Sequence, residues 1–514
     1  MRTFATVVTT VSMLGALSPI SSANASTAIE MNPIDTHEYL VEFHKNPKKV
    51  MNTPLARRDQ DGKLILPTSQ PIGTRSPELD VMIETRDRTR AKICAAAGSF
   101  CDRKEKPGFW AEADKENQIT DFLWEKEYVG NLLEMEQKGL TKAILPEAPW
   151  SDSFWPMNRG LIARRWMDKG FPDSATWLDN YNYYLARGPM SVGVNSMAAS
   201  EKYDLLVGDY NFTLTQANWG AGQSAQKDFG YVPAWQGLCH GWAPASFVAA
   251  NPKRAVTVRS PNGTAITFYP SDIKALASQS WGAAPPRVNF VGVRCKTSHP
   301  KEDEFGRVID GACFDVNPAT WHLAITNQIG VLKRAFVFDS TYDFQVWNYP
   351  VDAYSYKYFN PQTKAVSDRL SGAVVLRSEF STDKFKNYRS INTKYVVGIA
   401  MEVTYITPTG PSTAPNDKVS AHTIKYVYDL ELDDKGKIVG GEWYSNFHPD
   451  FIWQPPKEGK PLSVAEKQMS TPIAWDGKGP VPPELQAAAR TSSRREQPVS
   501  VIVDTLVRMA QEPE

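Results

Sequence analysis

A cysteine near the middle of the chain stands in a sequence context that suits a nucleophile. Cys239 lies in Gly237-Leu-Cys-His-Gly-Trp-Ala-Pro-Ala245, directly before a run of helical character. A thiol attacks a carbonyl carbon as the thiolate, which the partial positive charge of a helix N-terminus favours. Pro244 fits the first turn of a helix but not deeper positions, so the regular helix is expected after Gly241. Cys239 is therefore predicted as a nucleophile just before a helix.

A nucleophilic thiol needs a base, and the base needs a group that holds its ring. His322 lies in a segment, residues 320–329, that is predicted as a strand, and Asp339 lies in the next predicted strand. If Gly330–Val331 form a two-residue turn, the register places His322 opposite Asp339, with Cβ atoms about 4.5 to 5.5 Å apart. Each residue alone would be ordinary core, but together they predict a Cys239–His322–Asp339 triad.

Other arrangements are less compatible with the sequence. His240 adjoins the thiol, but neighbouring helix side chains point about 100° apart, so it is expected to face away from the sulfur. The segment Ser271-Asp-Ile-Lys274 matches S-x-x-K without its partner motifs, and after Pro270 it is read as a helix start. The chain contains no H-E-x-x-H, G-x-S-x-G or P-loop motif. A metal site at Cys239, His240 and His322 lacks the spacing of a zinc set.

The overall composition limits what can surround this thiol. The chain has 514 residues, 42% of them hydrophobic, with 57 Lys and Arg against 57 Asp and Glu. At roughly 100 to 200 residues per domain, one large domain with additions or two to three domains are allowed. A formal charge of zero removes the general electrostatic case for nucleic acid or an anionic membrane as a partner.

The first 25 residues have the pattern of a secretory signal peptide. Arg2 precedes an apolar stretch over residues 4–20, and Ala23-Asn-Ala25 matches a cleavage site. The apolar stretch is too short to span a bilayer, and no later segment holds about 18 uninterrupted apolar residues. We therefore expect a secreted or periplasmic protein without a membrane span.

Export changes the meaning of the five cysteines, because nearby pairs tend to form disulfides outside the cytoplasm. Spacing favours pairing Cys94 with Cys101 and Cys295 with Cys313, which leaves Cys239 alone. Sequence does not fix connectivity, so this pairing is a hypothesis.

Helical patterns precede the thiol and strand patterns follow it, which predicts an α+β fold with the cysteine helix packed on an antiparallel sheet. A hairpin with an Asn-Gly turn is expected over 256–269. Helices are predicted over 76–97, 114–135, 242–250 and 499–509, and strands over 288–294, 320–329, 335–341, 396–407, 423–432 and 437–444. The predicted divisions are a signal peptide (1–25), a helical N-terminal region that opens with a mobile lead-in to residue 75 (26–150), a catalytic domain (151–453), and a Pro/Lys-rich linker with a short helix (454–514).

The segments around these residues resemble the transglutaminase elicitor family, known from secreted proteins of plant-pathogenic oomycetes. The resemblance extends over roughly 200–453 and rests on residues 237–245, on 317–330 and on Phe338-Asp-Ser-Thr341. It includes Gln345-Val-Trp-Asn-Tyr-Pro-Val351, which looks like the surface segment that plants perceive in the oomycete proteins. The following Asp352-Ala-Tyr replaces a basic, Gly-containing stretch, so this recognition is not carried over.

The resemblance implies a protein-glutamine γ-glutamyltransferase with a papain-like Cys-His-Asp site. Cys239 would attack a glutamine carboxamide, release ammonia and form a thioester; His322 would move protons, and Asp339 would orient His322. A lysine or other primary amine would then accept the acyl group. Oxyanion donors would come from the Cys239 N–H and from Gln236 or Trp235.

The resemblance also implies a calcium dependence, as described for oomycete members. The acidic run Glu302-Asp-Glu304 and Asp204 or Asp209 are candidate ligands, although their spacing is not that of an EF-hand. A dry site is needed for an amine to outcompete water at the thioester. Trp residues near the predicted catalytic segments are candidate walls of that site: Trp219, Trp235, Trp242, Trp281, Trp321 and Trp347.

Two other functions remain open. A cysteine peptidase or amidase on the same scaffold would transfer the acyl group to water, and a non-catalytic secreted binding protein would use the aromatic residues for recognition. By its position, the region 26–150 is also a candidate pro-segment.

Overall fold

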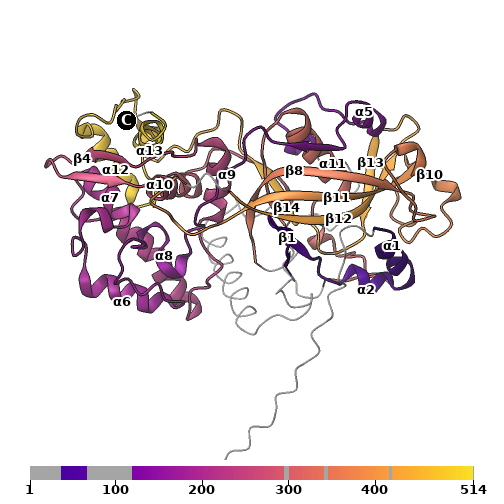
Figure 1. Ribbon diagram of the computed structural model, residues 1–514, viewed down its shortest axis with the longest axis horizontal. Coiled ribbons are helices and arrows are strands. Elements are labelled where there is room, and N and C mark those ends of the chain that lie inside the picture. Colours follow the sequence, from indigo (N-terminus) through magenta and orange to yellow (C-terminus); the bar gives the residue numbers. More distant parts are fainter. Residues whose placement is uncertain (1–35, 66–118, 294–299, 341–344, 416–418, 513–514) are drawn as a thin grey trace, which may run out of the picture.

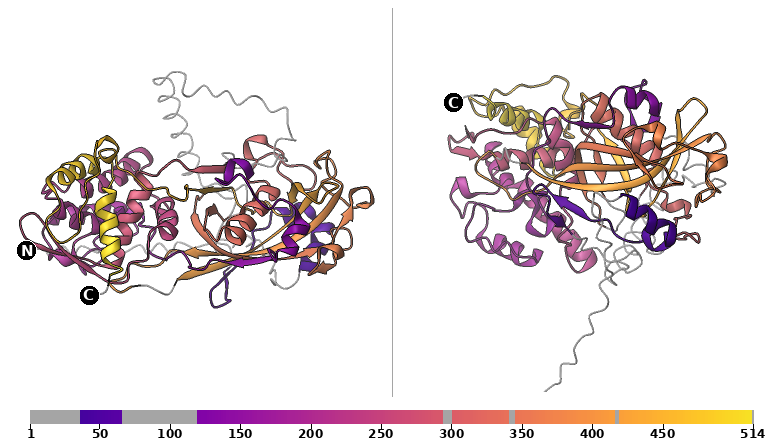
Figure 2. Two further views of the ribbon diagram at one scale, coloured as in Figure 1. Left: turned by 90° about the horizontal axis from the view of Figure 1, so that it is seen from above. Right: turned by 45° about the vertical axis from the view of Figure 1, so that its right-hand side comes forward.

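The computed structural model describes residues 36–65, 119–293, 300–340, 345–415 and 419–512 (Figure 1). Helices gather at one end of the molecule and long antiparallel strands at the other, an arrangement that is also visible from above (Figure 2). This confirms the predicted α+β class at the level of mixed helices and antiparallel sheet. Among the described residues, no helix is long and apolar enough to cross a membrane.

The strands of the described residues form one large antiparallel sheet of twelve strands and a separate hairpin. The main path of the sheet runs β2 (Leu64–Ile65), β1 (Arg57–Asp59), β12 (Ser420–Leu432), β11 (Tyr395–Thr407), β8 (Asn348–Phe359), β7 (Val337–Asp339), β14 (Phe451–Gln454) and β6 (Asn289–Gly292). Four short strands attach to this path: β3 (Lys142–Ile144), β9 (Val366–Ser367), β10 (Val375–Leu376) and β13 (Ile438–Trp443).

The long strands form where β-branched and aromatic residues recur. Strand β11 reads Tyr-Val-Val-Gly-Ile-Ala-Met-Glu-Val-Thr-Tyr-Ile-Thr and pairs along its whole length with β12, from Tyr395 opposite Leu432 to Thr407 opposite Ser420. Such residues pack well on a pleated surface. The predicted strands 288–294, 335–341, 396–407, 423–432 and 437–444 are confirmed, apart from small shifts at their ends.

The helical end is built around one buried helix. Every residue from Pro270 to Trp281 in α10 (Pro270–Ala283) is buried. A helix start was predicted after Pro270, and the helix begins at Pro270 itself. The other elements of this end are α6 (Trp177–Arg187), α7 (Ala199–Leu206), α8 (Thr213–Phe229), α9 (Cys239–Val248), α12 (Pro483–Ser493), α13 (Ser500–Met509) and the predicted hairpin β4 (Val256–Arg259) and β5 (Ala265–Phe268). Of these, α7, α9, α13 and β5 contact α10. Helix α9 lies where the helical end meets the sheet and contacts β8 (Figure 1).

The predicted strand 320–329 is wrong, because these residues form a helix. Helix α11 (Pro318–Ile325) begins with Pro318, and the side chain of Asn317 accepts a hydrogen bond of 2.8 Å from the N–H of Ala319. It continues as a π-helical turn over Thr326–Val331. All of residues 320–329 are buried, and the periodicity of a short segment that is buried on every side does not distinguish a strand from a helix. The cap and the proline were the local signal for a helix.

The mobile lead-in expected over 26–75 is wrong for its described part. Residues 36–65 form α1 (Thr36–Lys45), α2 (Pro47–Met51), β1 and β2. Strand β1 pairs with β12, and Phe43 stacks on Tyr444 with ring centroids 4.5 Å apart. The N-terminal region is therefore packed on the sheet.

Two other helix and linker predictions need correction. The helix expected over 114–135 is two short helices, α4 (Ile119–Phe122) and α5 (Leu132–Gln137), and the linker 454–499 contains α12. The predicted helix 76–97 and the signal peptide 1–25 lie outside the described residues. The domain boundaries at 150 and 453 stay predictions.

Candidate functional site

Cys239 is the first residue of α9, one turn earlier than predicted, so Pro244 lies inside the helix. The chain before it is held by hydrogen bonds from Leu238 N–H to Phe154 O, at 2.7 Å, and from Met157 N–H to Gln236 O, at 2.7 Å. Gly237 allows this approach, because a Cβ there would lie 2.7 Å from the oxygen of Phe154. A short β-bridge thus fixes the segment that leads into α9.

On its other side α9 packs tightly against α10. A Cβ on Gly241 would lie 2.1 Å from the carbonyl oxygen of Ser278, so only glycine allows the two helices to approach this closely. His240 is exposed and its ring lies beside Gly282 on α10. The prediction that His240 faces away from the sulfur is therefore confirmed, and the sulfur itself faces the sheet.

The thiol of Cys239 is free and 5% exposed. Its Sγ lies 3.8 Å from the carbonyl oxygen of Val346 and 3.6 Å from Nδ2 of Asn348. The main-chain N–H groups of Asn348 and His240 also donate toward the sulfur. Within the described part of the chain, no hydrogen bond joins an imidazole to this sulfur.

The charges around the sulfur act in opposite directions. Burial, the largest effect, raises the pKa of the Cys239 thiol; the N–H groups of Asn348 and His240 lower the pKa, and the nearby carboxylate of Asp339 raises it. Burial therefore favours the neutral thiol, for which the carbonyl oxygen of Val346 is the acceptor.

Asp339 lies at the end of β7, directly opposite Asn348 at the start of β8. It is buried and accepts a hydrogen bond of 3.3 Å from the N–H of Trp347. Burial and the charge of Asp339 raise the pKa of Asp315 well above its usual value. The carboxylate of Asp339 thus interacts electrostatically both with the Cys239 thiol and with Asp315.

A chain of aromatic contacts lies next to these groups, because Trp347 and Tyr349 flank Asn348 in the sequence. Phe154 meets the ring of Trp347 edge to face at 5.1 Å, and Trp347 lies parallel to Tyr349 at 6.1 Å. Tyr349 in turn contacts Tyr405 at 4.9 Å. Burial first, then the charges of neighbouring groups that include Asp339 and Cys239, raise the pKa of Tyr349 well above its usual value.

His322 is not part of this cluster, so the predicted His322–Asp339 pair is wrong. It is fully buried on α11, its Nδ1 lies 2.9 Å from the hydroxyl of Tyr428, and its ring lies 4.9 Å from that of Tyr356. Burial lowers the pKa of His322 to about 3. Tyr356 and Asn348 are eight positions apart on β8, a span of about 26 Å in an extended strand. Strand β7 pairs with β8 and β14 instead of a strand that carries His322.

The other predicted site residues divide into two groups. Trp235 and Gln236 are half-buried and directly precede α9. Trp242 is buried in the main core, and Trp219 belongs to a separate aromatic cluster, where it stacks on Tyr184 at 5.4 Å. Trp242 and Trp219 therefore act in packing, whereas Trp235 and Gln236 stay candidates for the site.

The segment 345–351 runs from an exposed Gln345 into the buried part of the sheet. Asn348, Tyr349 and Val351 are buried in β8, which runs through the middle of the sheet. Sequence reasoning missed both this strand and Asn348. The signal was the alternation of bulky apolar and aromatic residues from Tyr349 to Phe359, which favours a strand.

Two of the five cysteines, Cys239 and Cys313, lie in the described part of the chain. Cys94, Cys101 and Cys295 lie outside the described residues. Cys313 is disulfide-bonded, and Cys239 is free as predicted. The partner of Cys313 is not among the described residues, so both pairings stay predictions.

The proposed calcium ligands are engaged in other contacts. Asp204 accepts hydrogen bonds from the N–H groups of Leu214 and Thr215 at 3.1 and 3.0 Å, and thereby caps α8. Asp209 accepts from the N–H of Thr213 at 3.3 Å. In the described ranges no group of three His, Cys, Asp or Glu side chains could hold a metal ion.

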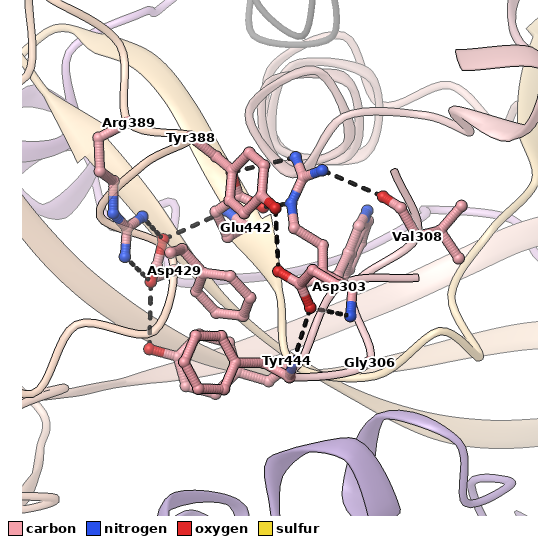
Figure 3. Close-up of polar contacts among 12 residues, drawn as sticks. Asp303, Gly306, Val308, Tyr388, Arg389, Asp429, Glu442 and Tyr444 are labelled. Atoms are coloured by element: carbon pink, nitrogen blue, oxygen red, sulfur yellow. Dashed lines mark hydrogen bonds and ion pairs between the residues drawn. The ribbon is translucent and has the colours of Figure 1, made fainter. Parts of the chain in front are cut away.

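The acidic run at 302–304 also has a structural use. Figure 3 shows Asp303 in a polar network at the far end of the sheet, where it accepts a hydrogen bond of 3.0 Å from Tyr388. It closes its own turn by accepting from the N–H of Arg307 at 3.0 Å, and Glu302 lies 3.5 Å from Nζ of Lys48. The calcium prediction is untested.

Comparison with known proteins identifies the family. The sequence matches the transglutaminase elicitor family over residues 121–471. Among solved structures, the chain is similar to the GP42 transglutaminase from Phytophthora sojae, with 23% sequence identity, a TM-score of 0.47, and coverage of 69% of this chain and 92% of that one. No curated protein matches the sequence. Because the family match spans more than half of its length, the chain belongs to the transglutaminase elicitor family.

Proposed function

We propose that this protein is a protein-glutamine γ-glutamyltransferase in which Cys239 is the nucleophile. The observation that carries the proposal is the free thiol at the N-terminus of α9, enclosed by N–H donors and beside a buried carboxylate. Membership of the transglutaminase elicitor family supports this reaction class. The N-terminal sequence pattern further supports export to a secreted or periplasmic location.

Acyl transfer proceeds in two steps on the sulfur. The Cys239 thiol loses its proton, and the thiolate attacks the carboxamide carbon of a glutamine side chain. The C–N bond breaks, the nitrogen leaves as ammonia with a proton from the site, and a thioester remains. A primary amine such as lysine then attacks the thioester, gives up a proton, and releases the sulfur.

Among the described residues, Asp339 is the proton acceptor that the site offers. Its carboxylate is close enough to the thiol to raise the pKa of Cys239, and no described imidazole is hydrogen-bonded to the sulfur. In this proposal His322 supports the core and takes no part in the chemistry. Phe154, Trp347 and Tyr349 limit access of water, which favours transfer to an amine over hydrolysis.

The test is incorporation of a fluorescent primary amine into a glutamine-containing peptide, with ammonia release measured in parallel, in calcium and in EDTA. Wild type is expected to incorporate the amine, and Cys239→Ser and Asp339→Asn to lose at least about 10²-fold in rate. Ammonia without amine incorporation would identify a hydrolase. If neither incorporated amine nor ammonia forms in calcium or in EDTA, the protein is a binding protein and the proposal is contradicted.

A further inference from the structure

Asn348 links the sulfur to a buried indole. Its Nδ2 lies 3.6 Å from Sγ of Cys239, and its Oδ1 accepts a hydrogen bond of 2.8 Å from Nε1 of Trp453. The Asn348 side chain is buried, and its main chain is fixed in the β7–β8 ladder opposite Asp339. The sheet therefore fixes the main chain that carries this amide.

Trp453 also determines which end of the amide faces the sulfur. An indole N–H is only a donor, so it requires the oxygen of Asn348 and turns the NH₂ group toward Cys239. A flipped amide would place two donors together at a buried position and leave both without an acceptor, which is costly. Trp453 is itself 8% exposed and comes from β14, on the other side of β7.

The amide is one of three N–H donors around one sulfur, with the main-chain N–H groups of Asn348 and His240. A neutral thiol needs at most one acceptor for its proton, which Val346 provides at 3.8 Å. Three donors match the needs of an anionic sulfur instead. The N–H groups around Sγ therefore match the negative charge that the sulfur carries after the thiol loses its proton.

We propose that Asn348 is a further catalytic residue whose Nδ2–H donates to the Cys239 thiolate, and that Trp453 is a positioning residue that holds this amide in the donating orientation. The inference rests on the proposed function, since it assigns a role within the same reaction. No bond of Asn348 is made or broken; when the proton leaves Sγ, the electron pair that stays on sulfur accepts the hydrogen bond.

Two variants distinguish the role of the Asn348 amide from that of the Trp453 indole that orients it. Asn348→Leu keeps the branched shape and removes the donor, and Trp453→Phe keeps a buried ring but removes the N–H that fixes the amide. Trp475→Phe is the matched control, because Trp475 is 7% exposed and its Nε1 donates to Gly479 O at 2.9 Å, within the C-terminal segment. Far-UV circular dichroism and the melting temperature check that each variant folds.

Two measurements are made on each protein: kcat and KM for amine incorporation, and the pH dependence of Cys239 alkylation by iodoacetamide. Asn348→Leu is expected to raise the apparent thiol pKa by about one unit and to lower kcat about 10²-fold, as for other single donors to a developing anion. Trp453→Phe is also expected to raise the apparent thiol pKa and to lower kcat, in this case about 10-fold, with KM little changed. Trp475→Phe is expected to match wild type.

The outcomes distinguish this inference from the proposed function. Unchanged alkylation profiles and kcat in folded Asn348→Leu and Trp453→Phe would overturn the inference, while activity that depends on Cys239 would still uphold the function. If wild type incorporates no amine, the proposed function fails, and the alkylation profiles alone still decide whether Asn348 stabilises the thiolate. If Asn348→Leu does not fold, Trp453→Phe carries the same test.

Discussion

At the scale of single residues, the state of the Cys239 sulfur is set by its immediate neighbours. Burial is the largest influence and keeps the thiol protonated, and the N–H groups of Asn348 and His240 act against it. Since the attacking species is the thiolate, deprotonation is a step that the site has to assist. The donors lower the free energy of that step, and Asp339 can take the proton.

Substitution of His322 tests whether this residue takes part in the reaction or only in the packing of the core. The substitution His322→Asn keeps a polar atom near the hydroxyl of Tyr428 and removes the rest of the ring. Because His322 is fully buried among Tyr356 and Tyr428, the free energy of unfolding is expected to fall by about 1 to 3 kcal/mol. Urea unfolding measures this loss, and amine incorporation is expected to stay within about threefold of wild type. A large loss of kcat in a folded variant would instead make His322 the base.

The same variant has a defined pH signature. The folded pKa of His322 is about 3, below the usual 6.5, so only the unfolded chain takes up this proton between those values. The stability that neutral His322 provides is complete above pH 6.5 and is lost as the pH falls toward 3, by up to about 1.4 kcal/mol per pH unit. Urea unfolding at pH 7 and pH 5 should show a steeper loss in wild type than in His322→Asn. Equal losses would mean that His322 titrates normally.

The residue types at the site could be predicted from the sequence better than their partners could. The Gly237–Ala245 motif and the predicted export identified Cys239 as a free thiol at a helix start. Asp339 was found for the wrong reason, as the partner of His322. Asn348 was missed because its contact with Cys239 joins residues more than 100 positions apart, and no local pattern encodes such a contact.

At the scale of elements, the site depends on how α9 is held between the β-bridge at Phe154–Met157, helix α10 and strand β8. The glycines on either side of Cys239 make this possible, because Gly237 and Gly241 have no room for a Cβ. The position of the sulfur is therefore controlled by backbone packing in two directions. Small changes in that packing should affect activity before they affect the rest of the fold.

Gly241→Ala is the corresponding test. Its new Cβ would lie 2.1 Å from the oxygen of Ser278, so α9 and α10 must separate, and both stability and amine incorporation are expected to fall, the rate by about 10-fold or more. Gly220→Ala in α8 is the matched control, since nothing lies within 4 Å of its Cβ and alanine favours helix by up to about 1 kcal/mol. Thermal unfolding and the activity assay compare the two. A harmless Gly241→Ala would show that the helix crossing does not hold the sulfur.

The elements that could be predicted are those whose sequence pattern extends over only a few neighbouring residues. The hairpin β4–β5 with its Asn262-Gly263 turn and the long strands β11 and β12 carry patterns that act over a few residues. The run 320–329 is buried on every side, so its sequence has no amphipathic period that could decide between helix and strand. The triad prediction failed with it, because it depended on the register of a hairpin that does not form.

At the scale of the whole molecule, the sheet joins distant parts of the chain. Strand β1 pairs with β12 and β3 pairs with β8, so residues before 150 complete the sheet that contains the candidate site. The far end of the sheet is fixed by buried ion pairs, such as Arg389 with Asp429 and Arg307 with Glu442 (Figure 3). Breaking such a pair leaves a buried charge and is strongly destabilising.

Truncation tests whether the N-terminal region is separable. Removal of residues 1–65 deletes α1, α2, β1 and β2, exposes the edge of β12 and removes the stack of Phe43 on Tyr444, so stability is expected to fall by several kcal/mol. Removal of residues 1–35 leaves every described element in place and should be close to neutral. Thermal unfolding of the two truncated chains measures the difference. A stable, active chain without residues 1–65 would favour the pro-segment interpretation.

The central claim is that Cys239 carries the acyl group, and mass spectrometry of the enzyme during turnover tests it most directly. Wild type is mixed with a short glutamine peptide without an acceptor amine, quenched in acid, digested and mapped. An acyl adduct, with loss of ammonia, is expected on the peptide that contains Cys239 and is expected to be absent in Cys239→Ser. Amine incorporation that continues in Cys239→Ser, or an adduct on another residue, would contradict the assignment of Cys239 as the nucleophile.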